Sequence, residues 1–287
     1  MQPAPSSTFK KVNQYYYNPR NPLGKGGFGT VYLAKDQTKP EVEYAVKVVP
    51  MSMITSEPKL KELILREIQI LRQIKGEHIV SLTDVMQTAS SLYIFMDYCD
   101  GGSLKERLET EKTLDEEEAC LIIKQITEAF LSLSKLNILN AEGKEISIMH
   151  RDIKPDNIMF HKDQVKVADF GFAKVIQDID KNIMDKHTSV GTPLYCPPQI
   201  LARKEYSSKC DVWSTGVLFY ELIHGCVPWK ANSMKELLES VQTKQPVFSK
   251  KINSEIEDLI RKMLKVDEAD RLSWQEVYDH PALKELK

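Results

Sequence analysis

The sequence of 287 residues has few cysteines, and their arrangement excludes two kinds of cross-linked fold. The five are Cys99, Cys120, Cys196, Cys210 and Cys226. Because their number is odd and no two form a C-x-x-C pair, neither a disulfide framework nor a zinc knuckle is indicated. We therefore expect reduced thiols in an intracellular, cytoplasmic protein.

Long apolar runs are also missing. The longest, near residues 217–223, is far shorter than the ~20 residues that a membrane-spanning helix requires. The first residues show no charged-then-apolar signal, and Gln2 excludes myristoylation. We expect no membrane insertion.

Neither sign of charge is in excess, since 39 Lys and Arg residues face 41 Asp and Glu residues, giving a formal net charge of -2. This balance argues against a polybasic nucleic-acid surface, although a local patch could be contained within it. We expect no nucleic-acid partner. The composition, 42% hydrophobic and 28% charged, is that of a globular chain with room for about two packed units. It predicts neither a particular protein partner nor an oligomeric state.

Acidic, amide and basic side chains are concentrated in two short stretches. Residues 150–157 read HRDIKPDN and residues 169–171 read DFG. Apolar residues alternate in the segment between them, which predicts a short β-hairpin. That hairpin would bring Asn157 and Asp169 to one end, where an amide oxygen and a carboxylate can bind a hard metal ion. We expect a metal site there.

These two motifs at this spacing resemble the catalytic and metal-binding loops of protein kinases. Lys154, two residues after Asp152, is typical of the serine/threonine type. The resemblance spans roughly residues 20–283 and implies an α+β, two-lobed protein-kinase fold. A small antiparallel-sheet N-lobe with one helix is expected over residues 20–99, and a mainly helical C-lobe over residues 100–283.

The start of the chain has two distinct parts. Residues 1–19 contain three prolines and polar runs, and we expect a flexible lead-in there, with residues 15–17 (YYY) able to dock onto the first strand. Residues 24–31 read GKGGFGTV, a glycine pattern shared with dinucleotide-binding folds. The residues that follow are strand-like rather than helical, so we expect the glycines on a hairpin whose backbone amides can approach phosphates. This matches the phosphate-covering loop of kinases.

Lys47 interrupts an apolar strand, a position usually taken by an edge-protecting or snorkelling lysine. Lys47 ends the sequence YAVK, however, and this sequence matches the motif that contains the nucleotide-binding lysine of the family. Residues 59–75 show helical apolar spacing, and Glu67 lies on the apolar stripe. Because a buried carboxylate is costly unless it is paired, Glu67 needs a cation, and Lys47 is the candidate.

The resemblance implies a role for each catalytic residue. Asp152 would orient and deprotonate the substrate hydroxyl, and Lys154 would steady the γ-phosphate. Asn157 and Asp169 would hold Mg²⁺. The pair of Lys47 and Glu67 would bind the α- and β-phosphates of ATP.

The same resemblance predicts how ATP is held. The residues expected to line its site are Leu23, Gly24, Gly26, Gly29, Val31, Ala45, Lys47, Met96, Asp97, Cys99 and Met159. Met96 is the expected gatekeeper beside the adenine. The backbone of Asp97 and Cys99 is expected to hydrogen-bond the adenine ring.

Residues 211–222 are apolar nearly all round, which predicts a helix buried at the centre of the C-lobe. The pairs Ser103–Glu106 and Ser273–Glu276 have the spacing of capping boxes. Asp211 resembles the family aspartate that hydrogen-bonds the backbone of the His150–Arg151 turn.

Three further features concern the C-lobe. Residues 137–147 form an insertion that we interpret as surface decoration rather than a docking element. The long loop after Asp169 contains Thr188, the expected site of activating phosphorylation. Most kinases have Ala-Pro-Glu where this chain ends its loop with Gln199, so a neutral amide is expected to face Arg271.

The sequence therefore predicts a serine/threonine kinase that uses ATP and Mg²⁺ and acts on protein hydroxyls. Residues 169–174 and 191–195 most resemble the autophagy-initiating, Aurora-like and calcium/calmodulin-dependent branches, and the first of these is favoured. One alternative is a pseudokinase scaffold that binds nucleotide without turnover, against which the intact catalytic positions count. The other is a small-molecule kinase of related fold, which would normally lack a peptide platform such as residues 191–199.

Overall fold

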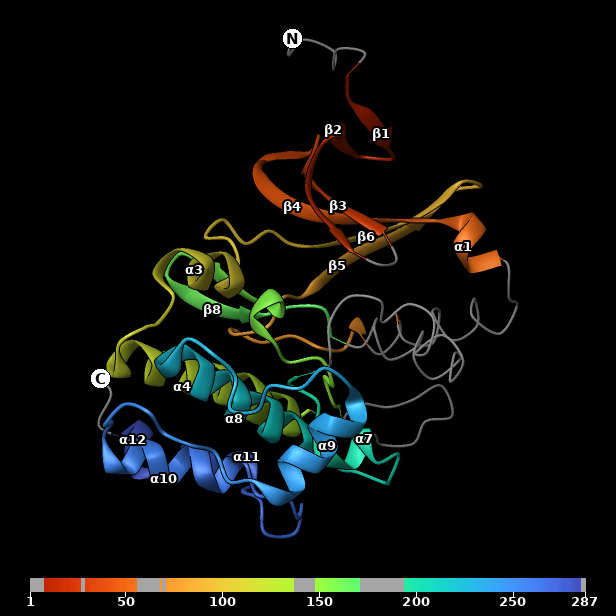
Figure 1. The fold of residues 1–287 in the computed structure, drawn as a ribbon. Helices are drawn as coiled ribbons and strands as arrows, with labels where there is room; N and C mark the ends of the chain where they lie inside the picture. Colours follow the sequence, from red (N-terminus) through yellow and green to blue (C-terminus); the bar gives the residue numbers. More distant parts are fainter. Residues whose placement is uncertain are drawn as a thin grey trace.

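The computed structural model describes residues 8–26, 29–55, 68, 71–136, 148–170 and 194–284. A sheet forms the N-lobe, at the top of Figure 1, and helices form most of the C-lobe below it. This is the two-lobed α+β arrangement that the sequence predicts. The expected helix over residues 59–75, the 137–147 insertion and Thr188 fall wholly or mostly outside the described residues.

The N-lobe sheet has six antiparallel strands in the order β1-β2-β3-β4-β6-β5. Their bounds are β1 Lys10–Val12, β2 Tyr15–Gly26, β3 Gly29–Asp36, β4 Lys39–Pro50, β5 Leu82–Gln87 and β6 Ser91–Asp97. A short helix, α1 (Met51–Thr55), follows β4. Because side chains alternate along β4, Val46 packs in one apolar cluster and Val49 in another, on opposite faces of the sheet.

Residues 10–19 belong to this sheet, which differs from the flexible lead-in expected over residues 1–19. Tyr15 is 4% exposed, and its ring stacks on Phe95 with centroids 3.9 Å apart. Tyr17 is also buried, in the same cluster as Val46. Burying two large aromatic rings offsets the entropy lost when the segment is ordered.

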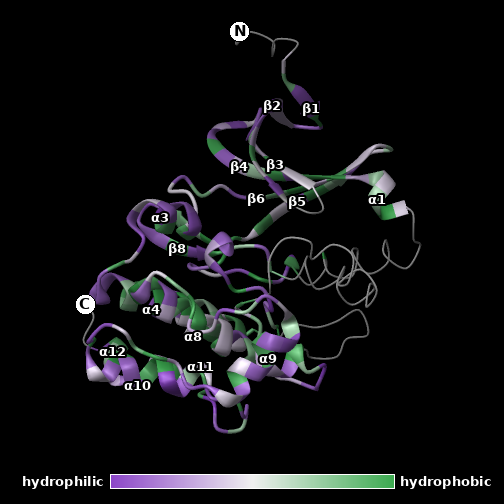
Figure 2. Cartoon of the chain, viewed as in Figure 1, coloured by the Kyte–Doolittle hydropathy of each residue, from purple (hydrophilic) through white to green (hydrophobic). Residues whose placement is uncertain are grey.

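The C-lobe is built around two helices that pack against each other and contain many apolar residues, drawn green in Figure 2. Its helices are α3 Leu104–Glu111, α4 Glu116–Ser134, α7 Pro198–Leu201, α8 Lys209–His224, α9 Met234–Thr243, α10 Ser254–Met263, α11 Trp274–Tyr278 and α12 Pro281–Lys284. The central pair are α4 and α8, and α8 is buried almost all round, as its sequence predicts. Among the described residues, no helix combines the length and the apolar character needed to cross a membrane.

Local capping signals set where two C-lobe helices begin. Ser103 and Glu106 form a capping box at the start of α3, as their spacing predicts. Ser273 and Glu276 form another at the start of α11. Each box satisfies backbone N–H groups that would otherwise lack a partner in the first turn.

The hairpin expected between the two motifs is also present. A 3-10 turn, η1 (Pro155–Asn157), leads into β7 (Ile158–His161), which pairs with β8 (Gln164–Val167). Its position between the lobes determines where the functional residues lie.

Candidate active site

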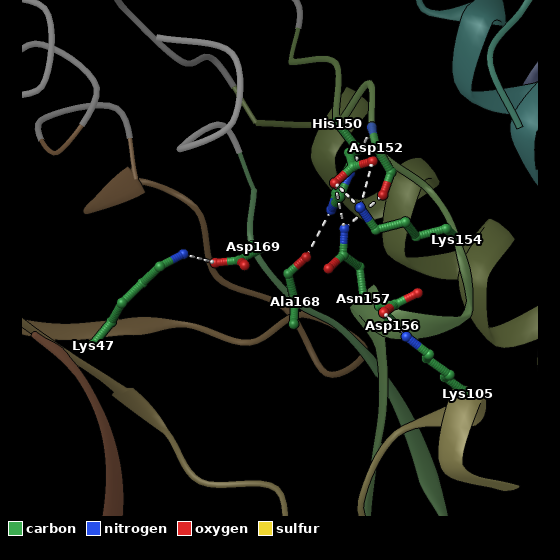
Figure 3. Close-up of polar contacts among 9 residues, drawn as sticks. All are labelled: Lys47, Lys105, His150, Asp152, Lys154, Asp156, Asn157, Ala168 and Asp169. Carbon is green, nitrogen blue, oxygen red and sulfur yellow. Dashed lines mark hydrogen bonds and ion pairs between the residues drawn. The ribbon is translucent and has the colours of Figure 1, made fainter. Parts of the chain in front are cut away.

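The β7–β8 hairpin brings the ends of the two motifs together, as predicted. Ile158 pairs with Val167 in the ladder, and Ala168 donates its N–H to Asn157 O at 2.9 Å. Asn157 and Asp169 therefore lie at the same end of the hairpin (Figure 3).

Asp152 is held by two neighbours in the same loop. Lys154 Nζ lies 3.0 and 2.7 Å from its two carboxylate oxygens. Asn157 Nδ2 donates to Asp152 Oδ2 at 2.9 Å and to Asp152 O at 2.7 Å. Figure 3 shows all three side chains converging. The lysine and the amide fix the orientation of the carboxylate.

The backbone on either side of Asp152 depends on a buried carboxylate from α8. Asp211 accepts N–H groups from His150 at 2.8 Å and from Arg151 at 2.7 Å, as the resemblance implies. Burial raises the pKa of Asp211, and these hydrogen bonds and the Arg151 guanidinium oppose that rise. Arg151 has a positive φ of 68°, a conformation that costs a non-glycine residue energy. The two hydrogen bonds to Asp211 help to hold it.

His150 joins the two motifs, a role that was not predicted. Its ring is fully buried, and Nε2 lies 2.7 Å from Ala168 O while Nδ1 accepts the Asp152 N–H at 3.2 Å. Because a carbonyl only accepts, Nε2 carries the proton. Its ring also packs edge-on against Phe170, with centroids 4.7 Å apart. The sequence signal that could have indicated this role is a histidine in a loop expected to be buried, because buried ring nitrogens need hydrogen-bond partners.

Lys47 reaches from β4 in the N-lobe to the second motif. Its side chain is 9% exposed, and Nζ lies 2.8 Å from Asp169 Oδ1. Asp169 adopts a positive φ of 60°. The expected partner Glu67 lies outside the described residues, so the predicted pair of Lys47 and Glu67 stays a prediction. The described contact instead places the lysine against a predicted metal ligand.

The structural need for glycine differs between positions in the phosphate-covering loop. A Cβ at Gly24 would meet nothing within 4 Å, which leaves open space beside the strand. A Cβ at Gly29 would lie 2.5 Å from Val48 O, so strand packing alone demands glycine there. Gly29 therefore has a structural reason besides the predicted approach of phosphates. Gly26 ends β2.

The other predicted ATP-site residues lie on strands of the two sheets. Val31 is paired with Lys47 in the sheet, and Ala45 is on the same face of β4 as Lys47. Leu23 is on β2, Met96 is on β6 and Met159 is on β7. They stay predictions for ATP contact.

The segment expected to bind adenine is anchored at its start. Asp97 donates its N–H to Ser81 O at 3.2 Å, and its carboxylate accepts the Ser81 N–H at 3.0 Å. Burial raises the pKa of the Cys99 thiol to about 11, so it is neutral near pH 7. Any recognition by Cys99 near neutral pH would therefore use its backbone or an uncharged side chain.

A small cavity of about 40 Å³ lies beside the Lys47–Asp169 pair. Apart from this ion pair, the lining is apolar. It consists of Met96, which was predicted as part of the site, and of six residues that were not: Leu71, Ile74, Val80, Leu82, Ile94 and Phe170. The strand-like alternation of apolar residues around positions 79–96 is the sequence signal that could have indicated this lining. This lining shields the ion pair from water on one side, which strengthens it.

The oxygen ligands at the end of the hairpin suit Mg²⁺. Asn157 uses its amide nitrogen toward Asp152, which leaves its oxygen as an acceptor, and the Asp169 side chain is 44% exposed. Hard oxygen ligands in small number suit Mg²⁺, which usually takes the rest of its ligands from water and substrate phosphates. When bound, the ion would neutralise phosphate charge.

Comparison with known proteins assigns the family. Residues 17–283 match the protein kinase domain. The chain belongs to the protein kinase family. It is 31% identical over 296 residues to human serine/threonine-protein kinase ULK1, covering 99% of this chain and 26% of that protein. It is 34% identical to calcium-dependent protein kinase 3 of Plasmodium yoelii yoelii, covering 96% of this chain and 49% of that protein.

A third relative is serine/threonine-protein kinase atg1 of Dictyostelium discoideum, 32% identical over 94% of this chain and 39% of that protein. The relatives match two of the three branches to which the sequence is most similar. This kinase domain spans between about a quarter and a half of the length of these relatives.

Proposed function

We propose that this kinase domain transfers the γ-phosphoryl group of ATP, with Mg²⁺, to serine and threonine hydroxyls of proteins. The observation that carries the proposal is the arrangement of Asp152, Lys154 and Asn157 in one hydrogen-bonded set. Phosphoryl transfer requires little covalent chemistry from a protein, so positioning and charge stabilisation are sufficient. The intact set favours an active enzyme over a pseudokinase scaffold.

Each residue has a distinct role in this proposal. Asp152 orients the attacking hydroxyl and accepts its proton, and Lys154 stabilises negative charge on the γ-phosphate. Lys47 binds the α- and β-phosphates. Asn157 and Asp169 hold Mg²⁺. The contact of Lys47 with Asp169 supports these last two roles because it brings the phosphate-binding and metal-binding groups together.

Protein rather than small-molecule substrates are supported by the segment that begins at residue 194. Ser214 donates its hydroxyl to Tyr195 O at 2.8 Å, and the Tyr195 hydroxyl donates to Glu221. Both partners come from α8, so a buried helix holds this segment in place. A rigid peptide-binding platform needs such anchoring.

Regulation by phosphorylation of Thr188 is part of the proposal. Thr188 lies outside the described residues. Arg151, the residue expected to bind its phosphate, lies within them. Arg151 lies over the Tyr206 ring, with its guanidinium carbon 4.8 Å from the centroid. A guanidinium oriented by an aromatic ring can donate two hydrogen bonds to a phosphate.

The test is phosphate transfer from ATP to a panel of generic proteins, with amino-sugar substrates in parallel and Mg²⁺ withheld as a control. We expect Mg²⁺-dependent labelling of serine and threonine in proteins alone. Nucleotide binding without any transfer would support the scaffold instead. Transfer to amino sugars alone would contradict a protein substrate.

A further inference from the structure

A second cavity, of about 570 Å³, shares no lining residue with the cavity beside Lys47. Its lining comes from the turn after β6, from α3 and α4, and from the β7–β8 hairpin. Figure 1 shows α3, β8 and α4 next to one another. The lining residues are Asp100, Gly101, Arg107, Glu118, Leu121, Ile122, Gln125, Phe160, Lys162, Asp163 and Val165. Its volume lies in the range of protein sites that bind ligands.

Backbone hydrogen bonds hold the walls of this cavity together. Gly101 donates to Phe160 O and Phe160 donates to Gly102 O, both at 2.9 Å. The two segments approach so closely that a Cβ at Gly101 would lie 2.7 Å from Phe160 Cβ. On the opposite wall, Val165 donates its N–H to Gln125 Oε1 at 2.7 Å. The cavity is therefore formed before any ligand arrives, which lowers the entropy cost of binding.

One of the two cations in the lining is already matched by carboxylates. Arg107 Nε donates to Glu111 Oε1 at 3.0 Å, and Arg107 Nη2 forms an ion pair with Glu118. The guanidinium carbon also lies 5.6 Å from the centroid of the Phe160 ring. With two carboxylates beside it, Arg107 offers little net positive charge to a ligand.

The remaining charges in the lining are mostly negative. Asp100 accepts the Lys162 N–H at 3.2 Å, and this hydrogen bond, with a smaller effect from His161, lowers the pKa of Asp100. Asp163 is exposed, and within the described part of the chain no hydrogen bond or ion pair involves its carboxylate. Lys162 is exposed beside it. The first turn of α4 adds Glu116 and Glu117 near Glu118. The cavity therefore attracts cations.

Apolar side chains complete the lining. Leu121, Ile122, Phe160 and Val165 supply a surface on which an aliphatic side chain can pack. A ligand that matches both features carries a cation next to an aliphatic group. Because acidic residues continue along α4 beyond the cavity, an extended peptide matches this surface better than a compact small molecule does.

We propose that this cavity docks a basic peptide segment of a partner protein. An arginine or lysine of the peptide lies between Asp100 and Asp163. A neighbouring leucine or isoleucine packs on Leu121 and Phe160.

The experiment measures binding without catalysis, so its result is independent of the proposed function. The probe is a short fluorescein-labelled peptide of arginine, leucine and alanine that contains no hydroxyl residue, and its partner probe has glutamate in place of arginine. Fluorescence anisotropy is measured at low and high salt. We expect binding of the arginine peptide alone, weakened by salt.

Two exposed residues at the tip of the hairpin provide the variants. Asp163→Lys should weaken binding by about fivefold, and Lys162→Glu should strengthen it, because each inverts one charge at the cavity. The matched control is Glu239→Lys on α9, an exposed position outside the cavity that changes the net charge as Asp163→Lys does. Thermal unfolding checks that each variant is folded.

Hydrogen exchange then locates the bound peptide. We expect protection in residues 100–107 and 158–165. Equal binding of the two probes, equal affinity of Asp163→Lys and Glu239→Lys, or protection confined to residues 150–157 would each overturn the proposal.

Discussion

Gln199 Oε1 accepts a hydrogen bond from Arg271 Nη2 at 3.0 Å, in a place where most kinases pair the arginine with a glutamate. Arg271 is 1% exposed, and its other donors bond to carbonyl oxygens: Nε to Lys265 O at 3.0 Å, Nη1 to Lys209 O at 2.9 Å and Nη2 to Val266 O at 3.3 Å. Burial lowers the pKa of Arg271 to about 10, although Glu268 and Asp267 partly oppose the shift. The cation is thus satisfied by hydrogen bonds, while its charge is compensated only from a distance.

Gln199→Glu should therefore stabilise the C-lobe. A charge-assisted hydrogen bond would replace a neutral one, a gain of about 1 kcal/mol or about 2–4 °C in Tm. Loss of the hydrogen bond from Gln199 Nε2 to Val266 O, now at 2.6 Å, works against this gain. Thermal melts of the wild type and the variant measure it. A gain that persists after Arg271→Ala would assign the effect to another partner, and an unchanged or lower Tm would refute it.

Asp152→Asn should lower turnover by about 10²-fold or more, because general-base contributions run to about 10²–10⁴. ATP affinity should stay near that of the wild type, since Lys47 and Asp169 are untouched. Steady-state kinetics and nucleotide titration measure the two effects. Asp156→Asn is the matched control: Asp156 pairs with Lys105 at 2.8 Å, and both side chains are about half exposed, so a much smaller change in turnover is expected. Full turnover by Asp152→Asn would remove its assigned role.

Thr188→Ala should prevent activation. If a phosphate on this residue binds Arg151, its loss removes at least one charge-assisted hydrogen bond and lowers kcat/KM by about tenfold or more. The measurement compares wild type, phosphorylated and dephosphorylated, with the variant. Ser189→Ala serves as the neighbouring control and should still be activated. Equal rates for dephosphorylated Thr188→Ala and phosphorylated wild type would mean that the loop needs no phosphate.

Glu221→Gln should stabilise the protein in a pH-dependent way. Burial, reinforced by Asp156, raises the pKa of Glu221 above its ordinary value of 4.5. The folded state then holds a proton that the unfolded state releases, so the wild type loses stability as the pH rises through this window. The glutamine cannot ionise but can still accept from Tyr195. The Tm difference between variant and wild type should grow from pH 4.5 upward.

The exposed control for this titration is Glu239→Gln on α9, for which no such dependence is expected. A Tm difference for Glu221→Gln that is constant with pH would contradict the burial argument. It would indicate that the carboxylate is as easily ionised in the fold as in the unfolded chain.

Tyr15→Ala tests whether the start of the chain is part of the domain. The side chain is buried and stacks on Phe95, so its removal should lower the free energy of unfolding by about 3 kcal/mol or more. Tyr16→Ala is the control, because that ring is partly exposed and touches Phe9 edge-on; its cost should stay below about 1 kcal/mol. Chemical denaturation compares them. Equal costs would favour a loosely attached lead-in.

Short-range sequence patterns determined much of this protein. The hairpin between the motifs, the capping boxes and the buried helix α8 each depend on residues a few positions apart, so their periodicity is visible in the chain. The spacing of Asp152, Lys154 and Asn157 likewise placed them in one loop. The contact of Gln199 with Arg271 followed from the resemblance, because both positions belong to motifs that the family pairs.

Only the tertiary structure decided which distant groups meet. The contact of Lys47 with Asp169 joins residues far apart in the chain, and no sequence pattern pointed to it. The burial of Tyr15 and the reason for Gly29 also depend on strands that pair across the sheet. These contacts depend on how whole helices and strands pack together. The pattern of neighbouring residues in one element does not specify which of its faces another element will cover.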